Sequence, residues 1–490
     1  MSGKLQIAIS GLQNEFISGK PTFSHFLSVF KKHTKFAFNV NEFPLVNAKL
    51  GEETQCIIPV DSGDLINTLT LRWKLYYKAS ISSEHFTGSP ANHGGGAIGR
   101  TYDDPFTPNV GMHGIDYAEL YIGGTLIERI TSDWIYLYHS YNKADYVFSN
   151  SVLYQTQATV ATDPYTPSWG GEGTGSDAKT VGTTTEHIWR LKQMYIDLPF
   201  YFYNNLPASI LACKLTKQNC YVKIKFKSHD KLVHPFLLPY TKDTNIESAS
   251  ILTKYTYLDN DELNYLKSRP IKQLITQTQL QQHDIPYNLL GDGASSVDTA
   301  AGDHLRIEIP LTLSNPIKNL YFFTVRKSRL HNKVAVYGYF PNILYGYYPN
   351  VFSTRYEYMM TTFFKSAGLK LNGNYLFNES YSKLVYDNRL NTSLSSFGGG
   401  VDFFKNRYDG SGSYSFALYP TSNEPSGHLN LNRIIDKKFV LEPTFLTLGV
   451  PGGYIQNYAQ MPVGEPLELN IYGTCYNMLV YSDGLCGLKY

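Results

Sequence analysis

Two pairs of histidines in this chain could bind a metal ion if their spacing allowed it. His229 and His234 are five residues apart, whereas two ligands share a helical face at i and i+4 and share a strand face at even spacing. His93 and His113 bracket a glycine-rich stretch, and no other feature supports a metal ion there. The spacing therefore predicts surface or loop histidines and no metal site.

Motifs for catalysis and for nucleotide binding are absent from the sequence. There is no G-x-S-x-G elbow, no G-x-x-x-x-G-K-[ST] loop and no H-E-x-x-H pair. GEGTGSD (171–177) superficially resembles a dinucleotide-binding loop, but it lies in a Thr/Ser-rich stretch without the following helix or later acidic residue. We predict no cofactor and no enzymatic activity.

The cysteines are few, and none form a C-x-x-C pair: Cys56, Cys213, Cys220, Cys475 and Cys486. This usage predicts buried, reduced thiols in a chain made in the cytosol. The N-terminus lacks the apolar region and cleavage site of a signal peptide, and no run approaches the ~18 apolar residues that span a bilayer. We expect a soluble protein made in the cytoplasm.

One dense basic cluster, KKHTK (31–35), lies between the aromatic stretches FLSVF and FAF. It fits a solvated strand end, and it also fits an inward-facing patch that contacts acidic partners, membrane headgroups or nucleic acid. The formal net charge of the whole chain is only +2. We therefore predict no specific binding of nucleic acid.

Two N-glycosylation sequons are present, at Asn378 (NES) and Asn391 (NTS). A chain without a signal peptide does not meet the glycosylation machinery of the endoplasmic reticulum. Both asparagines are kept as candidate glycosylation sites because other routes of modification exist.

Length and composition indicate a β-rich protein of two large domains. A single core stops growing at roughly 250–300 residues, and this chain has 490. Its 40 Tyr and 27 Phe favour half-buried strands, and its 39 Gly and 24 Pro supply turns.

Two glycine-containing turns predict the same β-hairpin at two places in the chain. Each lies between apolar stretches, in ELYIGGTLIERI (119–130) and GLKLNGNYLF (368–377). Type I′ hairpin turns need positive φ at both central positions, which Gly-Gly and Asn-Gly supply at little cost. A phosphate-binding loop would precede a helix, but here an apolar strand follows. The predicted turn residues are Gly123, Gly124, Asn372 and Gly373.

The same separation recurs elsewhere in the chain. The two turns are 249 residues apart, and IPVDSGDLINTLTL (58–71) aligns with IPLTLSNPIKNLYF (309–322) at 251. A third, weaker pair places YVKIKF (221–226) beside LNIYGT (469–474), again about 249 apart. These pairs predict an internal duplication, with the acidic stretch 259–269 as a connecting helix.

Short helices and long loops are expected around the strands. Helices are predicted after each hairpin, at 131–141 and 379–387, and the first would be capped by Ser132 or Asp133. Stretches rich in Gly, Ser, Thr and Pro predict long surface loops at 80–114, 155–185 and 388–413.

These features together resemble the double jelly-roll major capsid proteins of nucleocytoplasmic large DNA viruses. The aromatic-Ser-Phe-Ala-Leu…Pro-Ser-Gly…Asn-x-x-Arg-Ile arrangement at 414–434 is the most specific of them. The loops 80–114 and 155–185 match no part of the family pattern. The stretches that carry the resemblance are 11–38, 114–141, 194–226, 255–268, 369–377, 414–434 and 469–480.

The resemblance implies an all-β fold of two tandem eight-stranded jelly-roll β-sandwiches with short helices and long surface loops. It implies an N-terminal base segment (1–30), a first roll (31–258), and a connector helix with a second roll (259–490). The chain would be a structural protein without catalysis, forming homotrimeric, pseudo-hexagonal capsomers in the icosahedral capsid of a large DNA virus. It would assemble in the host cytoplasm, in a virus factory.

The partners implied are neighbouring capsomers, minor capsid proteins and penton proteins, with the base segment near an inner membrane. Two other interpretations stay open from the sequence. A tandem jelly-roll lectin is suggested by the tyrosine-rich stretch 335–360. A minor capsid component is the other, although the paired repeat disfavours a fivefold position.

Overall fold

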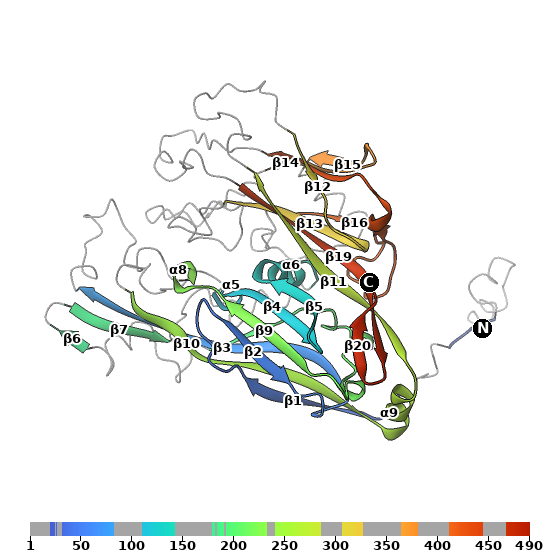
Figure 1. Cartoon of the computed structure of the whole chain (residues 1–490), viewed down its shortest axis with the longest axis horizontal. Coiled ribbons are helices and arrows are strands. Elements are labelled where there is room, and N and C mark those ends of the chain that lie inside the picture. The colour runs from blue at the N-terminus through green and yellow to red at the C-terminus, as the bar shows by residue number, and fades with distance from the viewer. Residues whose placement is uncertain are drawn as a thin grey trace, which may run out of the picture.

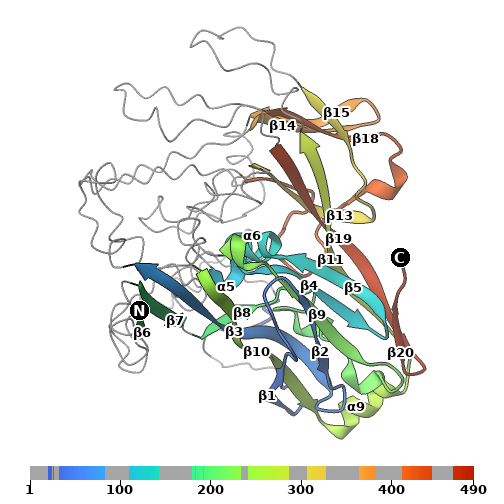
Figure 2. The ribbon, with the colours of Figure 1, turned by 60° about the vertical axis from the view of Figure 1, so that its left-hand side comes forward.

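The computed structural model describes residues 20–24, 26, 32–82, 110–142, 179–181, 184–190, 193–232, 241–285, 306–326, 364–380, 411–443 and 467–490. Their strands form four antiparallel sheets, which pack as two β-sandwiches (Figures 1 and 2). We call the sandwich built from strands β1 to β10 roll 1, and the one built from β11 to β20 roll 2. Strands β11 and β19 of roll 2 extend along roll 1 (Figure 2).

Roll 1 contains two sheets. The first has the order β1-β10-β3-β7-β6, with β8 paired to β3, and the second has the order β2-β9-β4-β5. The bounds are β1 Phe36–Pro44, β2 Glu53–Ile58, β3 Leu65–Ser82, β4 Ile115–Ile122, β5 Thr125–Thr131, β6 Lys179–Val181, β7 Thr184–Arg190, β8 Met194–Asp197, β9 Cys220–Phe226 and β10 Thr241–Leu258.

Roll 2 repeats this arrangement. Its first sheet has the order β11-β19-β13-β16, with β17 paired to β13 and β20 to β19, and its second has the order β12-β18-β14-β15. The bounds are β11 Ile271–Ile285, β12 Ile307–Pro310, β13 Pro316–Arg326, β14 Phe364–Leu371, β15 Asn374–Ser380, β16 Ser411–Ser415, β17 Leu429–Asn430, β18 Lys437–Pro443, β19 Leu467–Ser482 and β20 Leu485–Leu488.

The two strand orders are the same once β6 and β7 of roll 1 and β17 and β20 of roll 2 are set aside as additions, which leaves eight strands in each roll. In each roll the first strand pairs with the last, the last pairs with the third, and the second sheet runs second, penultimate, fourth, fifth. This wrapping of antiparallel strands into two facing sheets is the jelly roll. The fold is therefore all-β, two tandem eight-stranded jelly-roll sandwiches, as the sequence predicted.

Even the irregularities of the sheets are duplicated. Where the third strand meets the last, one residue is skipped in each roll, Asn67 in roll 1 and Lys318 in roll 2. Where the fourth strand meets the fifth, Ile127 and Leu376 are skipped. Because a bulge turns the strand and re-aims a side chain, its repetition shows that the copies match residue by residue.

One sequence pairing was wrong. YVKIKF lies in β9, the penultimate strand of roll 1, whereas LNIYGT lies in β19, the last strand of roll 2. The counterpart of β9 is β18, and the counterpart of β19 is β10. Alternating apolar and polar residues fit any half-buried strand, so the pattern could not distinguish neighbouring strands of one sheet.

The helices of the described residues are short. The connector α9 (Asn260–Lys267) follows Asp259, whose side chain accepts a hydrogen bond from the Asn260 amide. The other short helices are α5 Val110–His113, α6 Ser132–Asn142, α8 His229–Leu232 and the 3-10 turns η2 Leu206–Ala208, η3 Ala212–Lys214 and η6 Leu431–Arg433. The connector helix between the rolls was predicted correctly.

The cap of α6 was predicted one residue too late. Thr131, and neither Ser132 nor Asp133, caps the helix, because its hydroxyl accepts from the Trp134 amide at 3.3 Å. The predicted helix 379–387 begins inside β15, and its residues beyond 380 lie outside the described residues.

Parts of the predicted long loops are ordered elements. Strand β3 extends to Ser82 and α5 begins at Val110, both within 80–114. Strand β6 and the start of β7 lie within 155–185. The rest of these two stretches, and residues 388–410, lie outside the described residues.

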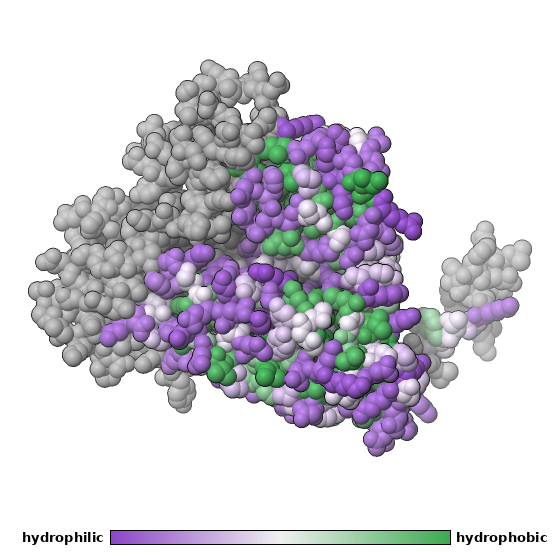
Figure 3. Space-filling model, viewed as in Figure 1, coloured by the Kyte–Doolittle hydropathy of each residue, from purple (hydrophilic) through white to green (hydrophobic). Residues whose placement is uncertain are grey.

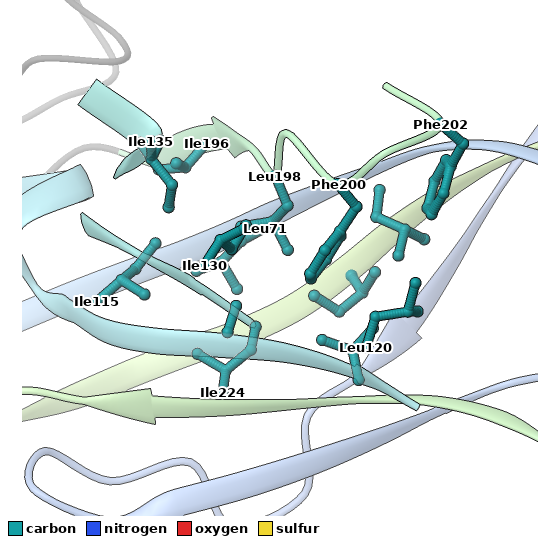
Figure 4. Close-up of a cluster of buried hydrophobic side chains, with 14 of the residues drawn as sticks. Leu71, Ile115, Leu120, Ile130, Ile135, Ile196, Leu198, Phe200, Phe202 and Ile224 are labelled. Atoms are coloured by element: carbon teal, nitrogen blue, oxygen red, sulfur yellow. The ribbon is translucent and has the colours of Figure 1, made fainter. Parts of the chain in front are cut away.

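The core of roll 1 lies between its two sheets. Strand β9 alternates buried and half-buried residues, and β2 alternates exposed and buried ones, as expected of strands with one face inward. Burying one Leu, Ile or Phe side chain stabilises the fold by about 1.5–3 kcal/mol. Figure 4 shows side chains from both sheets and from α6 pointing toward one another: Leu71, Ile115, Leu120, Ile130, Ile135 and Ile224.

Candidate functional site: the interface between the rolls

No metal centre is present among the residues that the structure describes, since no three His, Cys, Asp or Glu side chains gather there. His229 begins α8 and His113 ends α5. His93, His234 and the glycine stretch 171–177 lie outside the described residues. In the same described residues, no helix is long and apolar enough to cross a membrane.

The cysteines are free thiols, and burial suppresses their reactivity. Desolvation raises the pKa of Cys56 to about 11 and that of Cys220 to about 12. Desolvation also raises the pKa of Cys213, Cys475 and Cys486. Because the thiolate is the reactive form, these thiols are poor nucleophiles near neutral pH.

The glycine turns join the fourth and fifth strands of each roll. Gly123 and Gly124 have φ of +59° and +85°, and Asn372 and Gly373 have +48° and +84°. A third turn of this kind, Asp483-Gly484 with φ of +54° and +81°, joins β19 to β20. Sequence reasoning missed it, although Asp-Gly between apolar stretches predicts a hairpin.

The remaining sequence candidates lie in separate places. Asn378 is half-buried within β15, and Asn391 lies outside the described residues. Residues 32–35 of the basic cluster are exposed and directly precede β1. The structure therefore does not bring the predicted candidates together into one site.

What the structure does bring together is an aromatic cluster between the rolls. Trp134, on α6 of roll 1, lies 5.8 Å from the Tyr472 ring and 5.7 Å from the Tyr321 ring, centroid to centroid. The Thr131 and Tyr472 hydroxyls share a hydrogen bond of 2.8 Å. Tyr472 also stacks on Phe323 at 6.0 Å. Buried aromatic contacts of this kind are typical of permanent interfaces.

A buried carboxylate crosses the same interface. Glu128 of β5 accepts hydrogen bonds from the backbone amides of Tyr201 (2.8 Å) in roll 1 and Thr278 (3.1 Å) in β11. Burial raises the pKa of Glu128 to about 8, even though these two amides act in the opposite direction. A single side chain therefore couples the backbones of both rolls.

Glutamines on β11 complete the contact. Gln273 donates to the carbonyls of Pro207 and Ser209, both at 2.9 Å, and Gln277 donates to the Ile127 carbonyl at 2.5 Å. These bonds satisfy backbone acceptors along the edge of roll 1 that would otherwise be desolvated without a partner.

The connector and the C-terminal hairpin are held on roll 1 as well. The Lys214 ammonium donates to the Leu266 carbonyl at 2.8 Å and to the Arg269 carbonyl, so it neutralises the C-terminal end of α9. The Cys486 amide of β20 donates to Gln218 at 2.6 Å. Tyr481 and Cys486 are both part of the core of roll 1. The interface joins the rolls into one block, and it contains no nucleophile–base pair.

Sequence reasoning missed this interface. The only signal was the polar alternation QLITQTQLQQ (273–282), which is unusual for an edge strand. Glu128 is surrounded in the sequence by strand residues, and its partner Thr278 is 150 positions away.

Comparisons with known proteins agree with this architecture. A family model described as the N-terminus of major capsid proteins matches residues 24–259. The major capsid protein of Pyramimonas orientalis virus is 24% identical over 507 residues, covering 100% of this chain and 99% of the relative. The major capsid protein of Paramecium bursaria Chlorella virus 1 is 23% identical, covering 100% of both chains.

Solved structures show the same fold. A chain in a quasi-atomic model of the PBCV-1 virus capsid superposes with a TM-score of 0.63 at 18% identity, covering 95% of this chain and 100% of that one. The Faustovirus major capsid protein superposes with a TM-score of 0.60 at 10% identity, covering 96% of this chain and 94% of that one.

The two matched rolls and their sealed interface define a double jelly-roll structural protein. Along its whole length the chain is similar to major capsid proteins of nucleocytoplasmic large DNA viruses, and this similarity indicates a structural role in the virion capsid.

Proposed function

We propose that the chain assembles as a homotrimer in which six rolls form a pseudo-hexagonal capsomer of an icosahedral shell. The observation that carries this proposal is the repetition of strand order and bulges in the two rolls. A chain with two equivalent halves needs only threefold symmetry to give a near-sixfold outline, which fills a flat lattice.

The interface between the rolls supports a role as a rigid unit. Trp134 and Glu128 fix roll 1 against roll 2 inside one chain, so the spacing of two of the six uprights is set before assembly. We divide the chain accordingly into a base segment (1–30), roll 1 (31–258), and the connector with roll 2 (259–490).

The proposed role includes no catalysis. Contacts to neighbouring capsomers, minor capsid proteins and penton proteins would use the outer faces of the trimer, and the base segment would lie near an inner membrane. Assembly would take place in the host cytoplasm.

Sedimentation of the purified chain tests the proposal. We expect one species with three times the chain mass of 55.4 kDa, persisting at nanomolar concentration because obligate interfaces bury roughly 2,000–5,000 Å². Negative-stain images should show particles with a hexagonal outline. A stable monomer in sedimentation, with no hexagonal particles, would overturn the proposal.

A further inference from the structure

Strands β1 and β11 occupy the same place in their rolls, so their residues can be matched. Asn41 pairs with Thr253 of β10, and Gln279 pairs with Gly473 of β19. Thr253 and Gly473 in turn face Leu69 and Leu320, which are equivalent positions of the third strands. Residues 35–40 of roll 1 therefore correspond to residues 273–278 of roll 2.

These matched strands differ in what covers them. On β11, Gln273 and Ile275 are buried because roll 1 lies against that edge. On β1, the whole run from Phe36 to Val40 is exposed. Lys35, Ala37 and Asn39, which match Gln273, Ile275 and Gln277, are all exposed. Figure 3 shows apolar and polar side chains intermixed on the surface of roll 1.

The backbone shows the same contrast. The Leu45 amide donates to the Ala249 carbonyl of β10. The backbone amides and carbonyls of odd-numbered residues of β1 therefore point toward β10, and those of even-numbered residues point toward the free edge of the sheet. At this edge the Val40 amide donates to the side chain of its neighbour Asn39. At the matched position of β11, the Thr278 amide donates to Glu128 of the other roll.

The surface that would face such an edge is also duplicated. In roll 1, the bulge residue Ile127 is 2% exposed because β11 covers it. Its match in roll 2, Leu376, is 46% exposed. The preceding residues are an internal control, since Leu126 is 41% exposed and its match Tyr375 is 43% exposed. Among residues 125–128 and their matches 374–377, only the position that the neighbouring roll covers differs between the copies.

We propose that β1 of one chain packs on β15 of a second copy in the way that β11 packs on β5 within the chain. Leu376 of one copy would be buried under residues 37–40 of the next. Asn39 matches Gln277, so its side-chain amide would face the Leu376 carbonyl. This inference rests on the proposed trimer, and it assigns the contact by which the ring closes.

The geometry favours a second copy over an unrelated partner. Each roll carries an open first strand on one side and a fifth strand on the other, so the contact is head-to-tail and can repeat around a ring. Within the chain, one such contact is already made, between β11 and β5. If the same contact between a first and a fifth strand is used again, β1 and β15 are the two strands that still lack a partner for it.

The interchain contact should also lack the buried carboxyl group of the intrachain one. The residue that matches Glu128 is Phe377, which is buried in the core of roll 2 and stacks on Tyr414 at 4.1 Å. No carboxylate then reaches the Val40 amide of the next copy. The side chains of β11 that contact roll 1, Gln273, Ile275 and Gln277, are matched on β1 by Lys35, Ala37 and Asn39.

Crosslinking tests the contact directly. The double variant Asn39→Cys with Leu376→Cys, treated with a short bismaleimide, should give covalent dimers and trimers on a denaturing gel. The control Asn39→Cys with Leu126→Cys should stay monomeric on the same gel. The wild type, whose native thiols are buried except for the half-buried Cys213, should stay monomeric as well. A trimer in solution whose N39C/L376C variant yields no interchain product would overturn the inference.

Substitution gives a second readout. Leu376→Asp should abolish the trimer peak in sedimentation, while Tyr375→Asp, at an equally exposed site, should keep it. Adding Asn39→Lys to Leu376→Asp should restore the trimer, which a folding defect would not allow. If Leu376→Asp is trimeric like the wild type, this contact is wrong and the proposed function stands. If the wild type itself is monomeric, the proposed function fails first.

Discussion

Roll 1 and roll 2 share one strand order, but they differ in what completes their cores. The core cluster of roll 1 includes side chains from roll 2: Ile275, Tyr321, Phe323, Tyr472, Leu479, Tyr481 and Cys486. The core cluster of roll 2 contains only its own residues, within the part of the chain that the structure describes. Two copies of one fold have therefore become unequal, because roll 1 depends on its neighbour for apolar burial.

The difference is clearest at one pair of matched positions. Glu128 of β5 faces the other roll, whereas Phe377 of β15 is buried in its own core. The backbone at both positions follows the same bulge. A single side chain therefore decides whether this position of the fifth strand contacts the neighbouring roll or the core of its own roll.

The largest effect is expected from Trp134→Ala, which removes the ring between Tyr321 and Tyr472. Large-to-small substitution in a core costs about 3–5 kcal/mol, since the lost contacts leave a cavity. We expect the free energy of unfolding of the chain to fall by this amount in urea titrations.

Phe439→Ala, in the core of roll 2, is the matched variant. Phe439 contacts Phe322 at 4.8 Å and touches no residue of the interface cluster around Trp134. If the rolls unfold as one unit, both variants lower a single transition. Two transitions, each lowered by one variant only, would show that the rolls unfold independently and that their interface is weak.

The next effect concerns the pH dependence that Glu128 of roll 1 gives to the interface between the rolls. The pKa of Glu128 is raised from 4.5 to about 8 by burial. A raised pKa in the folded state stabilises the protein fully below the unfolded value, and this contribution is lost as pH rises through the folded value. Between pH 5 and pH 8 the loss should reach about 3 kcal/mol.

Glu128→Gln keeps an acceptor but cannot titrate, so it isolates this contribution. The difference in unfolding free energy between wild type and Glu128→Gln should shift with pH over the window from 4.5 to 8, with the wild type losing stability as pH rises. Phe377 at the matched position predicts no such dependence for roll 2. A pH-independent difference would mean that Glu128 stays charged in the fold.

Sequence reasoning found the repeat where local chemistry is specific. Asn-Gly and Gly-Gly turns need positive φ, and Ile66 and Ile317, 251 residues apart, are both fully buried in third strands. It failed where only alternation was available, as with YVKIKF, because every strand of a sandwich alternates.

The interface could not be derived from the sequence for a different reason. Its contacts join residues far apart, such as Thr131 and Tyr472 at a separation of 341 positions. Trp134 lies within the helix predicted at 131–141, but the sequence pattern does not say which sheet this helix packs against. The identity of a packing partner depends on the tertiary arrangement, which no local spacing encodes.

The turns allow a test of smaller size. Gly124 and Gly373 both have open space where a Cβ would lie, so valine at either site is opposed by positive φ alone. We expect Gly124→Val and Gly373→Val to cost about 1–3 kcal/mol each, and similar amounts.

Gly123→Val should cost more, because its Cβ would overlap the side chain of Gln218. Thermal melts of the three variants give the ranking. An unchanged melting temperature for Gly373→Val would contradict the strain assigned to this turn.

The smallest effect is expected on the outer face of roll 2. Glu308 accepts from Lys370 at 2.8 Å and from Lys438 at 2.9 Å, and these two lysines lower its pKa to about 2. By strand register its matched position in roll 1 is Gln55, which is exposed and uncharged. Exposed pairs are screened by water and salt, so Glu308→Gln should change the melting temperature only slightly.

The sign of the remaining effect is fixed by the lowered pKa of Glu308. Its contribution is present above the unfolded value of 4.5 and is lost as pH falls through about 2. The small difference between wild type and Glu308→Gln should therefore vanish in acid and in high salt. A difference that survives both conditions would instead show that the glutamine changes the packing of the outer face, which would make the two rolls less alike than their strand order implies.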